Sequence, residues 1–174
     1  MKYMILLEGK SEKALVDVII DKNLFKIDLQ DMLDERPFLN RQIDGSLLVM
    51  IRQLPIDEKI SIIRIGDKMT DILKIPKDIR EKVLSVEKYA TLPEFEILLI
   101  INEGLYKSYD KVKSKMKPKI FSKKEIKFKG VKYNNTYKWI SSYFTNVDIK
   151  ELLLKYKKIS KHEKKDKYLV DLVK

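Results

Sequence analysis

Acidic residues in this 174-residue chain follow apolar segments at places where a folded sheet would gather them. Glu8 directly follows the apolar run of residues 4–7, and Asp67 follows an isoleucine-rich stretch across Gly66. Glu96 opens an apolar helical pattern that comes after a third strand-like segment. The carboxyl ends of parallel strands meet at one edge of a sheet, so we expect these carboxylates to lie close together.

Carboxylates gathered in this way suit a hard divalent cation, because Mg²⁺ and Mn²⁺ prefer carboxylates together with waters and phosphate oxygens. Such an ion polarises a phosphate and generates hydroxide, and a pair of ions clamps both oxygens of a phosphodiester displacement. Two further acids each come four residues after one of these positions, where a helix would bring them nearby. The predicted metal ligands are therefore Glu8, Glu12, Asp67, Asp71 and Glu96.

Each acid also has a purely structural interpretation. Glu8 would be the first exposed residue after a buried strand, and Asp67 would be a turn or helix-capping acid. Glu94 and Glu96 fall in the first turn of a predicted helix, where an acid interacts favourably with the helix dipole. Both interpretations stay open on the sequence.

The residue types that are missing narrow the chemistry further. The chain has no cysteine, which excludes disulfides, cysteine-bound zinc and a thiol nucleophile. Its only histidine, His162, lies in a charged stretch and is expected on the surface, which disfavours a Ser-His-Asp triad. The apolar runs at residues 4–7 and 97–101 are too short for a signal peptide and a membrane span. We therefore expect a cytoplasmic protein without a membrane partner.

Apolar spacing and turn residues predict the elements that position these side chains. Strands alternate with helices, which indicates an α/β fold with a small, mostly parallel sheet flanked by helices. Ser11 is the expected N-cap of the first helix, and Gly104 is expected to end the last helix of this region. The predicted elements are strand 2–8, helix 11–23, a short strand at 38–43, helix 46–54, strand 59–65, helix 76–82, strand 83–89 and helix 93–103.

Positive charge is concentrated in the last third of the chain. Residues 1–110 carry a net charge of −3, whereas residues 111–174 carry +14. We therefore expect an α/β core over 1–110, followed by a lysine-rich, mainly helical segment over 111–174 that packs on it, with helices near 137–144, 149–158 and 168–172. An excess of this size favours a polyanionic partner, although a general preference for lysine in the composition is the alternative.

The lysines of this segment predict a surface that contacts nucleic acid. Between residues 111 and 119 every second residue is a lysine, which would line one face of an extended segment. Aromatic residues between 133 and 144 could stack on bases, but their spacing favours a helix face that packs on the core. The predicted nucleic-acid contacts are Lys10, Lys68, Lys113, Lys115, Lys117, Lys119, Lys123, Lys124 and Lys127.

Three short motifs resemble those of Toprim domains. Residues 3–12, YMILLEGKSE, resemble the opening motif, an apolar strand that ends in Glu-Gly with a second acid shortly after it. Asp67, after the stretch IIRIG, resembles the first acid of the Asp-x-Asp motif. Residues 93–99, PEFEILL, resemble the later acidic helix of the OLD-type and RloB-like branch. The resemblance covers about residues 1–105.

The resemblance implies a Toprim-like fold and a Mg²⁺- or Mn²⁺-dependent nuclease that cleaves DNA or RNA in phage defence or mobile-element biology. It implies that Glu8, Asp67 and Glu96 are catalytic, and that a partner ATPase or a homo-oligomer takes part. The family's second acid is missing, because Lys68 and Met69 follow Asp67. Either Asp71 replaces that acid, or the chain is a catalytically degenerate Toprim fold that binds nucleic acid or another protein.

Overall fold

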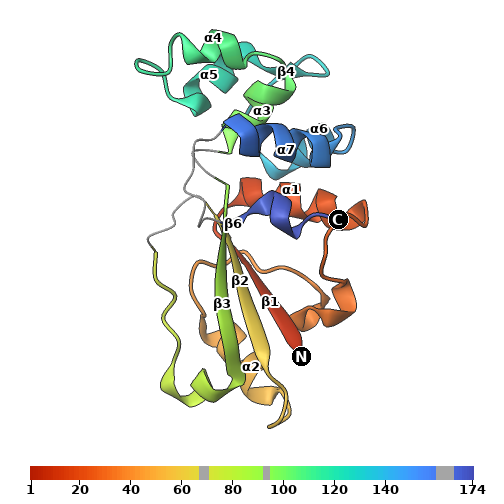
Figure 1. Cartoon of the computed structure of the whole chain (residues 1–174), viewed down its shortest axis with the longest axis vertical. Helices are drawn as coiled ribbons and strands as arrows, with labels where there is room; N and C mark the ends of the chain where they lie inside the picture. Colours follow the sequence, from red (N-terminus) through yellow and green to blue (C-terminus); the bar gives the residue numbers. More distant parts are fainter. Residues whose placement is uncertain (67–70, 92–94, 160–166) are drawn as a thin grey trace.

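Four parallel strands form the central sheet of the protein. In the computed structural model, which describes residues 1–66, 71–91, 95–159 and 167–174, their spatial order is β1-β2-β3-β6. All three strand pairs are parallel, so the α/β prediction with a parallel sheet flanked by helices is confirmed (Figure 1). The strands are β1 (Lys2–Leu7), β2 (Ile60–Gly66), β3 (Val83–Ala90) and β6 (Lys167–Tyr168).

Hydrophobic cores cover both faces of the sheet, which explains why β1 and β2 read as nearly continuous apolar runs. One core includes Ile5 and Ile63 and continues through the helices above the sheet. The other includes Met4 and Ile62 and is closed by the helix α2 (Gly45–Gln53). Alternate side chains of a strand point to opposite faces, so both sets had to be apolar.

Helices are layered on the carboxyl end of the sheet. Helix α1 lies next to the strands, α6 and α7 lie beyond it, and α4 and α5 are farthest from the sheet (Figure 1). The helices are α1 (Lys10–Asp21), α3 (Glu96–Asn102), α4 (Tyr106–Asp110), α5 (Pro118–Glu125), α6 (Tyr137–Phe144) and α7 (Ile149–Ile159). Short 3₁₀ turns are η1 (Leu29–Asp31), η2 (Leu33–Glu35), η3 (Lys77–Lys82) and η4 (Leu169–Leu172), and a hairpin joins β4 (Lys127–Phe128) to β5 (Val131–Lys132).

Two predictions for the first half of the chain are wrong in detail. Ser11 does not cap the first helix, because α1 begins at Lys10 and its N-cap is Gly9. The strand expected at 38–43 does not form, since Phe38 makes only a single bridge with Leu6. Helix α3 does end before Gly104, whose φ of +69° suits glycine.

Two predictions for the basic segment are also wrong. The lysines between 111 and 119 do not lie in an extended run, because turns follow α4 and a new helix begins at Pro118. The helix expected near 168–172 is instead strand β6 followed by η4, so the C-terminus supplies the fourth strand. A short strand at a chain end carries too few residues for its period to be recognised.

The basic segment shares the core of the first 110 residues. Phe144 of α6 and Leu152 of α7 belong to the same hydrophobic cluster as Leu15 of α1. The helix face that the spacing predicts to pack on the core comprises Tyr137, Ile140 and Phe144. This is confirmed for Ile140 and Phe144, which are buried, but not for Tyr137, which is 43% exposed. None of the described helices is long and apolar enough to cross a membrane.

Candidate functional site

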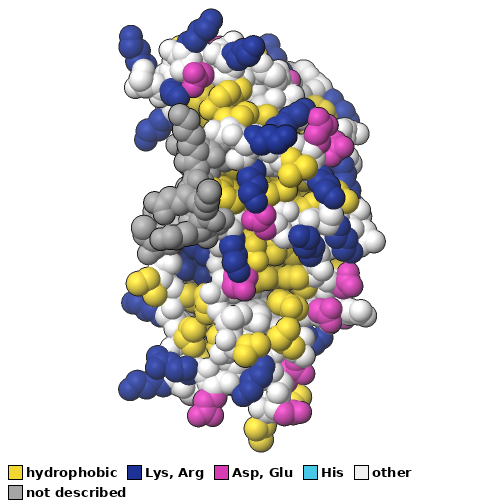
Figure 2. All heavy atoms as spheres, viewed as in Figure 1, with side chains coloured by type: hydrophobic (Ala, Val, Ile, Leu, Met, Phe, Trp, Pro, Cys, Tyr) yellow, Lys and Arg dark blue, Asp and Glu magenta, His cyan; other side chains and the backbone are white. Residues whose placement is uncertain are grey.

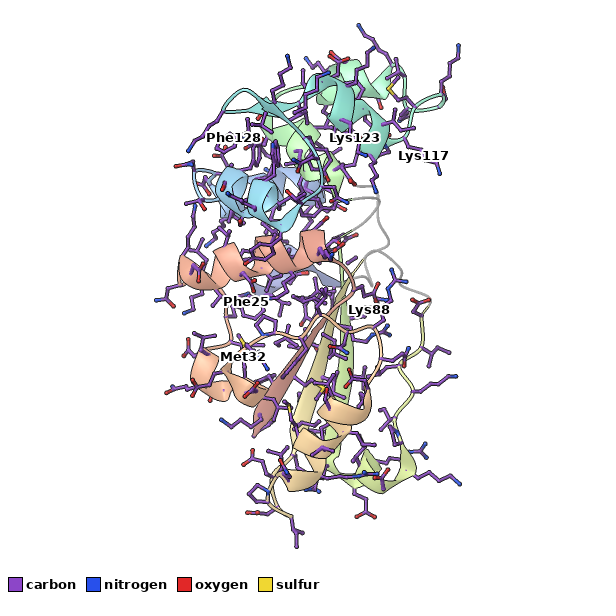
Figure 3. All side chains as sticks on the ribbon, turned by 180° about the vertical axis from the view of Figure 1, so that it is seen from behind. Phe25, Met32, Lys88, Lys117, Lys123 and Phe128 are labelled. Atoms are coloured by element: carbon purple, nitrogen blue, oxygen red, sulfur yellow. The ribbon has the colours of Figure 1, made fainter. Side chains whose placement is uncertain are left out.

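A cleft of about 540 Å³ opens at the carboxyl end of β1, where the sheet meets the helical layer. Three of the predicted metal ligands line it, together with cationic side chains that come from separate parts of the chain. Figure 3 shows Lys117 above the sheet and Lys88 beside the upper end of the strands. The lining residues are Glu8, Gly9, Lys10, Ser11, Glu12, Arg41, Phe95, Glu96, Lys117, Lys119 and Asn135.

The side chain of Glu8 is deeply buried, only 2% exposed. Its Oε1 accepts a hydrogen bond from Lys88 Nζ at 2.7 Å and another from Arg64 at 3.2 Å. Arg64 and Lys88 are register partners on the neighbouring strands β2 and β3, so both cations reach the same carboxylate. The other oxygen, Oε2, is buried and has no hydrogen-bond partner among the described residues.

Glycines on both sides of this carboxylate allow the close packing. A Cβ at Gly66 would collide with the Glu8 carboxyl group, and a Cβ at Gly9 would collide with the carboxyl group of Glu12. Glu12 is itself buried, and its Oε1 accepts a hydrogen bond from Thr91 at 3.4 Å. The Glu-Gly pair therefore serves a packing need, because only glycine leaves room for the two acids.

Glu96 is held by a chain of hydroxyl and amide groups from the basic segment. Tyr133 donates a hydrogen bond to Glu96 Oε1 at 2.9 Å and also lies 3.0 Å from Asn135 Oδ1. Ser11 donates to the same Asn135 oxygen at 2.6 Å. Burial and the neighbouring Glu96 raise the pKa of the Tyr133 hydroxyl, which keeps it a donor. The network connects the start of α1 to residues that lie more than a hundred positions later.

Cationic side chains surround the acids in the cleft. Lys10 and Arg41 come from the first half of the chain, and Lys117 and Lys119 come from the start of α5. Arg41 also donates through Nε to the backbone carbonyl of Glu8 at 3.4 Å. The cleft thus combines three buried carboxylates with four cations in its lining, a charge pattern that could hold both a divalent cation and the phosphate groups of a polyanion.

The predicted site residues divide into three groups in this structure. Glu8, Glu12 and Glu96 line the cleft, as do Lys10, Lys117 and Lys119. Asp71 does not line it, although its backbone carbonyl accepts a hydrogen bond from Arg64. Lys113, Lys115, Lys123, Lys124 and Lys127 are not among the lining residues either. The predictions for Asp67, Lys68, Glu94 and His162 lie outside the described residues.

Within the described ranges, no group of three or more His, Asp or Glu side chains is arranged to hold a metal ion. The acidic side chains are instead paired with residues that the sequence did not suggest for the site, namely Arg64, Lys88, Thr91 and Tyr133. Arg41 and Asn135 join the same network through the Glu8 backbone carbonyl and through Tyr133. One signal could have found a member of this set. Arg64 is a charged residue within the buried strand ISIIRIG, and a buried arginine requires an acidic partner.

Comparisons with known proteins find no match for this chain: no family model, no curated protein and no solved structure resembles it. The interpretation of the site therefore depends on its own residues and their contacts.

Proposed function

We propose that the protein is a Toprim-like nuclease that depends on a divalent metal and cleaves phosphodiester bonds of DNA or RNA. The observation that carries the proposal is the cleft in which three buried carboxylates, Glu8, Glu12 and Glu96, stand among four cationic side chains. The group lies at the carboxyl end of parallel strands, which is where α/β folds place their binding sites.

The donor atoms in the cleft fit a hard cation. Glu8, Glu12 and Glu96 offer only carboxylate oxygens, which Mg²⁺ and Mn²⁺ prefer. The buried Oε2 of Glu8 accepts no hydrogen bond from the part of the chain that the structure describes and is the atom best suited to a metal. When bound, such an ion would supply Lewis-acid polarisation of a phosphate and a nucleophilic hydroxide. By the Toprim resemblance, Asp67 would complete the ligand set.

The chain's own residues would bind and orient the phosphodiester. Lys10, Arg41, Lys117 and Lys119 provide donors for phosphate oxygens around the acids. Helix α5 begins after its N-cap residue Lys117, whose side chain makes no capping hydrogen bond, so the first N–H groups of the helix also favour an anion. Arg64 and Lys88 hold the Glu8 carboxylate in one position, which would preorganise it.

A second candidate function is nucleic-acid binding without catalysis. It is favoured by the two cations on Glu8 Oε1, because Arg64 and Lys88 already neutralise the carboxylate that a metal would need. In this case the cleft would hold a phosphate group directly through its lysines. Binding would then persist in EDTA and would fall steeply with salt.

The test measures cleavage of single-stranded DNA, duplex DNA and RNA with Mn²⁺ or Mg²⁺. Under the nuclease proposal, Glu8→Gln and Glu96→Gln reduce cleavage at least a hundredfold, an effect typical of lost charge stabilisation. The matched control is Glu151→Gln, an exposed glutamate on α7 that pairs only with Lys155. Its activity should equal that of the wild type.

Calorimetry with Mn²⁺ separates the two candidates. Cation binding that disappears in Glu8→Gln supports the nuclease, whereas absence of any Mn²⁺ binding contradicts it. For the lysines, Lys117→Ala/Lys119→Ala should weaken nucleic-acid binding and reduce its salt dependence, while Lys150→Ala/Lys155→Ala on α7 should change it little. Tight binding in EDTA without cleavage favours the second candidate.

A further inference from the structure

A groove of about 260 Å³ lies in the basic segment, outside the cleft. It is formed where the β4–β5 hairpin packs on helix α6. The lining residues are Phe128, Lys129, Val131, Asn134, Thr136, Lys138, Trp139 and Ser142. Figure 3 shows Phe128 on the opposite side of the helical layer from Lys117, which lines the cleft. The groove is therefore a second concave surface with its own set of side chains. Figure 2 shows the lysines and arginines spread over one face of the molecule.

Contacts between the hairpin and α6 hold the apolar part of the groove in place. Phe128 and Val131 are directly opposite each other in the hairpin register, so their side chains lie on the same face. Trp139 of α6 donates a hydrogen bond through Nε1 to the backbone carbonyl of Val131 at 3.2 Å. The rings of Phe128 and Trp139 meet edge to face with their centroids 6.0 Å apart, and Trp139 stacks on Tyr143 at 5.1 Å. These contacts preorganise an aromatic surface before any ligand binds.

Part of this aromatic surface can be reached from solvent. Val131 is 53% exposed, and Phe128 is partly exposed. The ammonium group of the exposed Lys129 lies over the Phe128 ring, 5.2 Å from its centroid, so a group that comes from the surface can reach the ring face. A lysine has a flexible stem and can leave this position for an anion, whereas the ring is held by its neighbours. The groove thus offers a flat aromatic face with an adjustable cation beside it.

The charge around the groove is positive. None of the described residues that line it is acidic, and residues 126–147 contain four lysines but no aspartate or glutamate. Among the described residues, none of these four lysines forms an ion pair. Two of them, Lys127 and Lys132, stand directly opposite each other across the hairpin, where like charges are destabilising. An anion bound at the hairpin would relieve this repulsion.

We propose that this groove binds an unpaired base of a nucleic-acid strand, with the base stacked on the Phe128 ring and the adjoining phosphates on Lys129 and Lys138. The inference rests on the proposed function in one respect, namely that the partner is a nucleic acid, and it adds that the bound part is single-stranded. Every base has a flat face that stacks on an aromatic ring whatever the sequence, whereas a duplex covers both faces of its bases. An acidic peptide would match the lysines but would leave the aromatic face without a partner.

The groove and the cleft are connected by one segment of the chain. Asn134 lines the groove, and the next residue, Asn135, lines the cleft. Tyr133, directly before them, donates its hydrogen bond to Glu96 in the cleft. A strand of several nucleotides that follows the lysine-rich surface would be held at both places, and the stacked base would fix which phosphate reaches the acids.

The fluorescence of Trp139 provides a direct test, because it is the only tryptophan of the chain and lines the groove. The titration uses an oligothymidylate of about 12 nucleotides in EDTA, where a metal-dependent nuclease leaves the strand intact. We expect this strand to quench or shift the Trp139 emission. An abasic strand of the same length keeps the phosphates but lacks the bases, and it should leave the emission nearly unchanged. Equal changes with both strands, or no change with oligothymidylate, would overturn the proposal.

Variants of Phe128 provide the second measurement, the affinity for labelled oligothymidylate by fluorescence anisotropy. Phe128→Leu keeps an apolar side chain for packing but removes the ring, so the affinity should fall at least fivefold. Phe128→Tyr keeps the ring and should bind like the wild type. The control, Tyr106→Leu, removes a partly exposed ring on α4, outside the groove, and should change binding little. Circular dichroism confirms that each variant is folded. Equal affinities of Phe128→Leu and the wild type would contradict the proposal.

Cleavage with Mn²⁺ separates this inference from the proposed function. If the wild type cleaves nucleic acid while Phe128→Leu binds oligothymidylate as tightly as the wild type, the nuclease proposal stands and the groove proposal fails. If oligothymidylate binds through Phe128 and changes the Trp139 emission but no cleavage occurs, the groove proposal stands and the nuclease proposal fails.

Discussion

The cleft and the outer edge of β3 differ in which side chains they bury and which they expose. In the cleft, charged groups are buried and matched, with Glu8 held by Arg64 and Lys88 and Glu96 held by Tyr133. On β3, Leu84 and Val86 are exposed, and Glu87 forms a partly exposed ion pair with Lys167. Lys88 links the two regions, because it lies on β3 and its Nζ neutralises the buried Glu8. One strand therefore supplies a buried cation to the cleft and exposes apolar side chains elsewhere along its length.

The largest effect is expected from breaking the buried ion pair. Among the described residues, Arg64→Met leaves Lys88 as the cation on the Glu8 carboxylate. Breaking a buried pair costs up to about 3–5 kcal/mol when the remaining charge is uncompensated, so this variant should approach the lower end of that range. Arg52→Met breaks an exposed pair with Asp78 and should cost at most about 1 kcal/mol. Urea unfolding of both variants measures the difference. Equal losses would mean that Glu8 is not held by a buried charge pair.

A smaller effect is expected from filling the space beside Glu8. In Gly66→Ala the new methyl group collides with the Glu8 carboxyl group, so we expect a loss of about 1–3 kcal/mol and a displaced carboxylate. Gly45→Ala, at the start of α2, meets no atom within 4 Å and should stabilise the protein by about 0.4–1 kcal/mol. Thermal melts compare the two variants. A neutral Gly66→Ala would show that the carboxylate is free to move.

The smallest effect concerns the Tyr133 hydroxyl. Tyr133→Phe removes the hydrogen bond to Glu96 and should cost about 1 kcal/mol, with most of the fold unchanged. The folded pKa of Tyr133 is raised by burial and by Glu96, so its contribution is complete below an unfolded pKa of about 10 and is lost as the pH rises above that value.

Unfolding measured from neutral to alkaline pH checks this sign. The wild type should lose stability above the unfolded tyrosine pKa, and Tyr133→Phe should lose less over the same interval. Tyr137→Phe is the comparison: Tyr137 is 43% exposed, and burial and the hydrogen bond to Asp17 raise its pKa to about 12, so this variant should relieve a smaller part of the loss than Tyr133→Phe. A wild type whose stability does not fall in alkaline solution would contradict the buried, proton-retaining tyrosine.

The local pattern of apolar and polar residues was sufficient to predict most of the sheet and part of the site. The apolar runs predicted β1, β2 and β3 close to their observed bounds, and the order of strands and helices predicted parallel pairing. The rule that sites lie at the carboxyl ends of strands predicted that Glu8 and Glu96 lie close together, and both line the cleft. Such predictions succeed because side-chain period and chain direction are local properties.

Other features could not be read from local pattern. Strand β6 has two residues, too few to show a period, and becomes a strand only because β3 offers an edge for it. The expected extended run of lysines gives way to turns and α5, which places Lys117 and Lys119 in the cleft and leaves Lys115 outside its lining. Arg64 and Lys88 both reach the Glu8 carboxylate because the register of β2 and β3 places these residues side by side, although they are 24 positions apart in the sequence.

The amino-acid order alone determined the class of fold, the excess of positive charge at the C-terminus and the acids that end the first strand and open α3. Tertiary structure decided which of these acids are neutralised, which lysines reach the cleft and which apolar side chains of β3 stay exposed. The physical reason is that composition and period act along the chain, whereas burial, ion pairing and edge protection depend on groups that meet only when distant segments fold together.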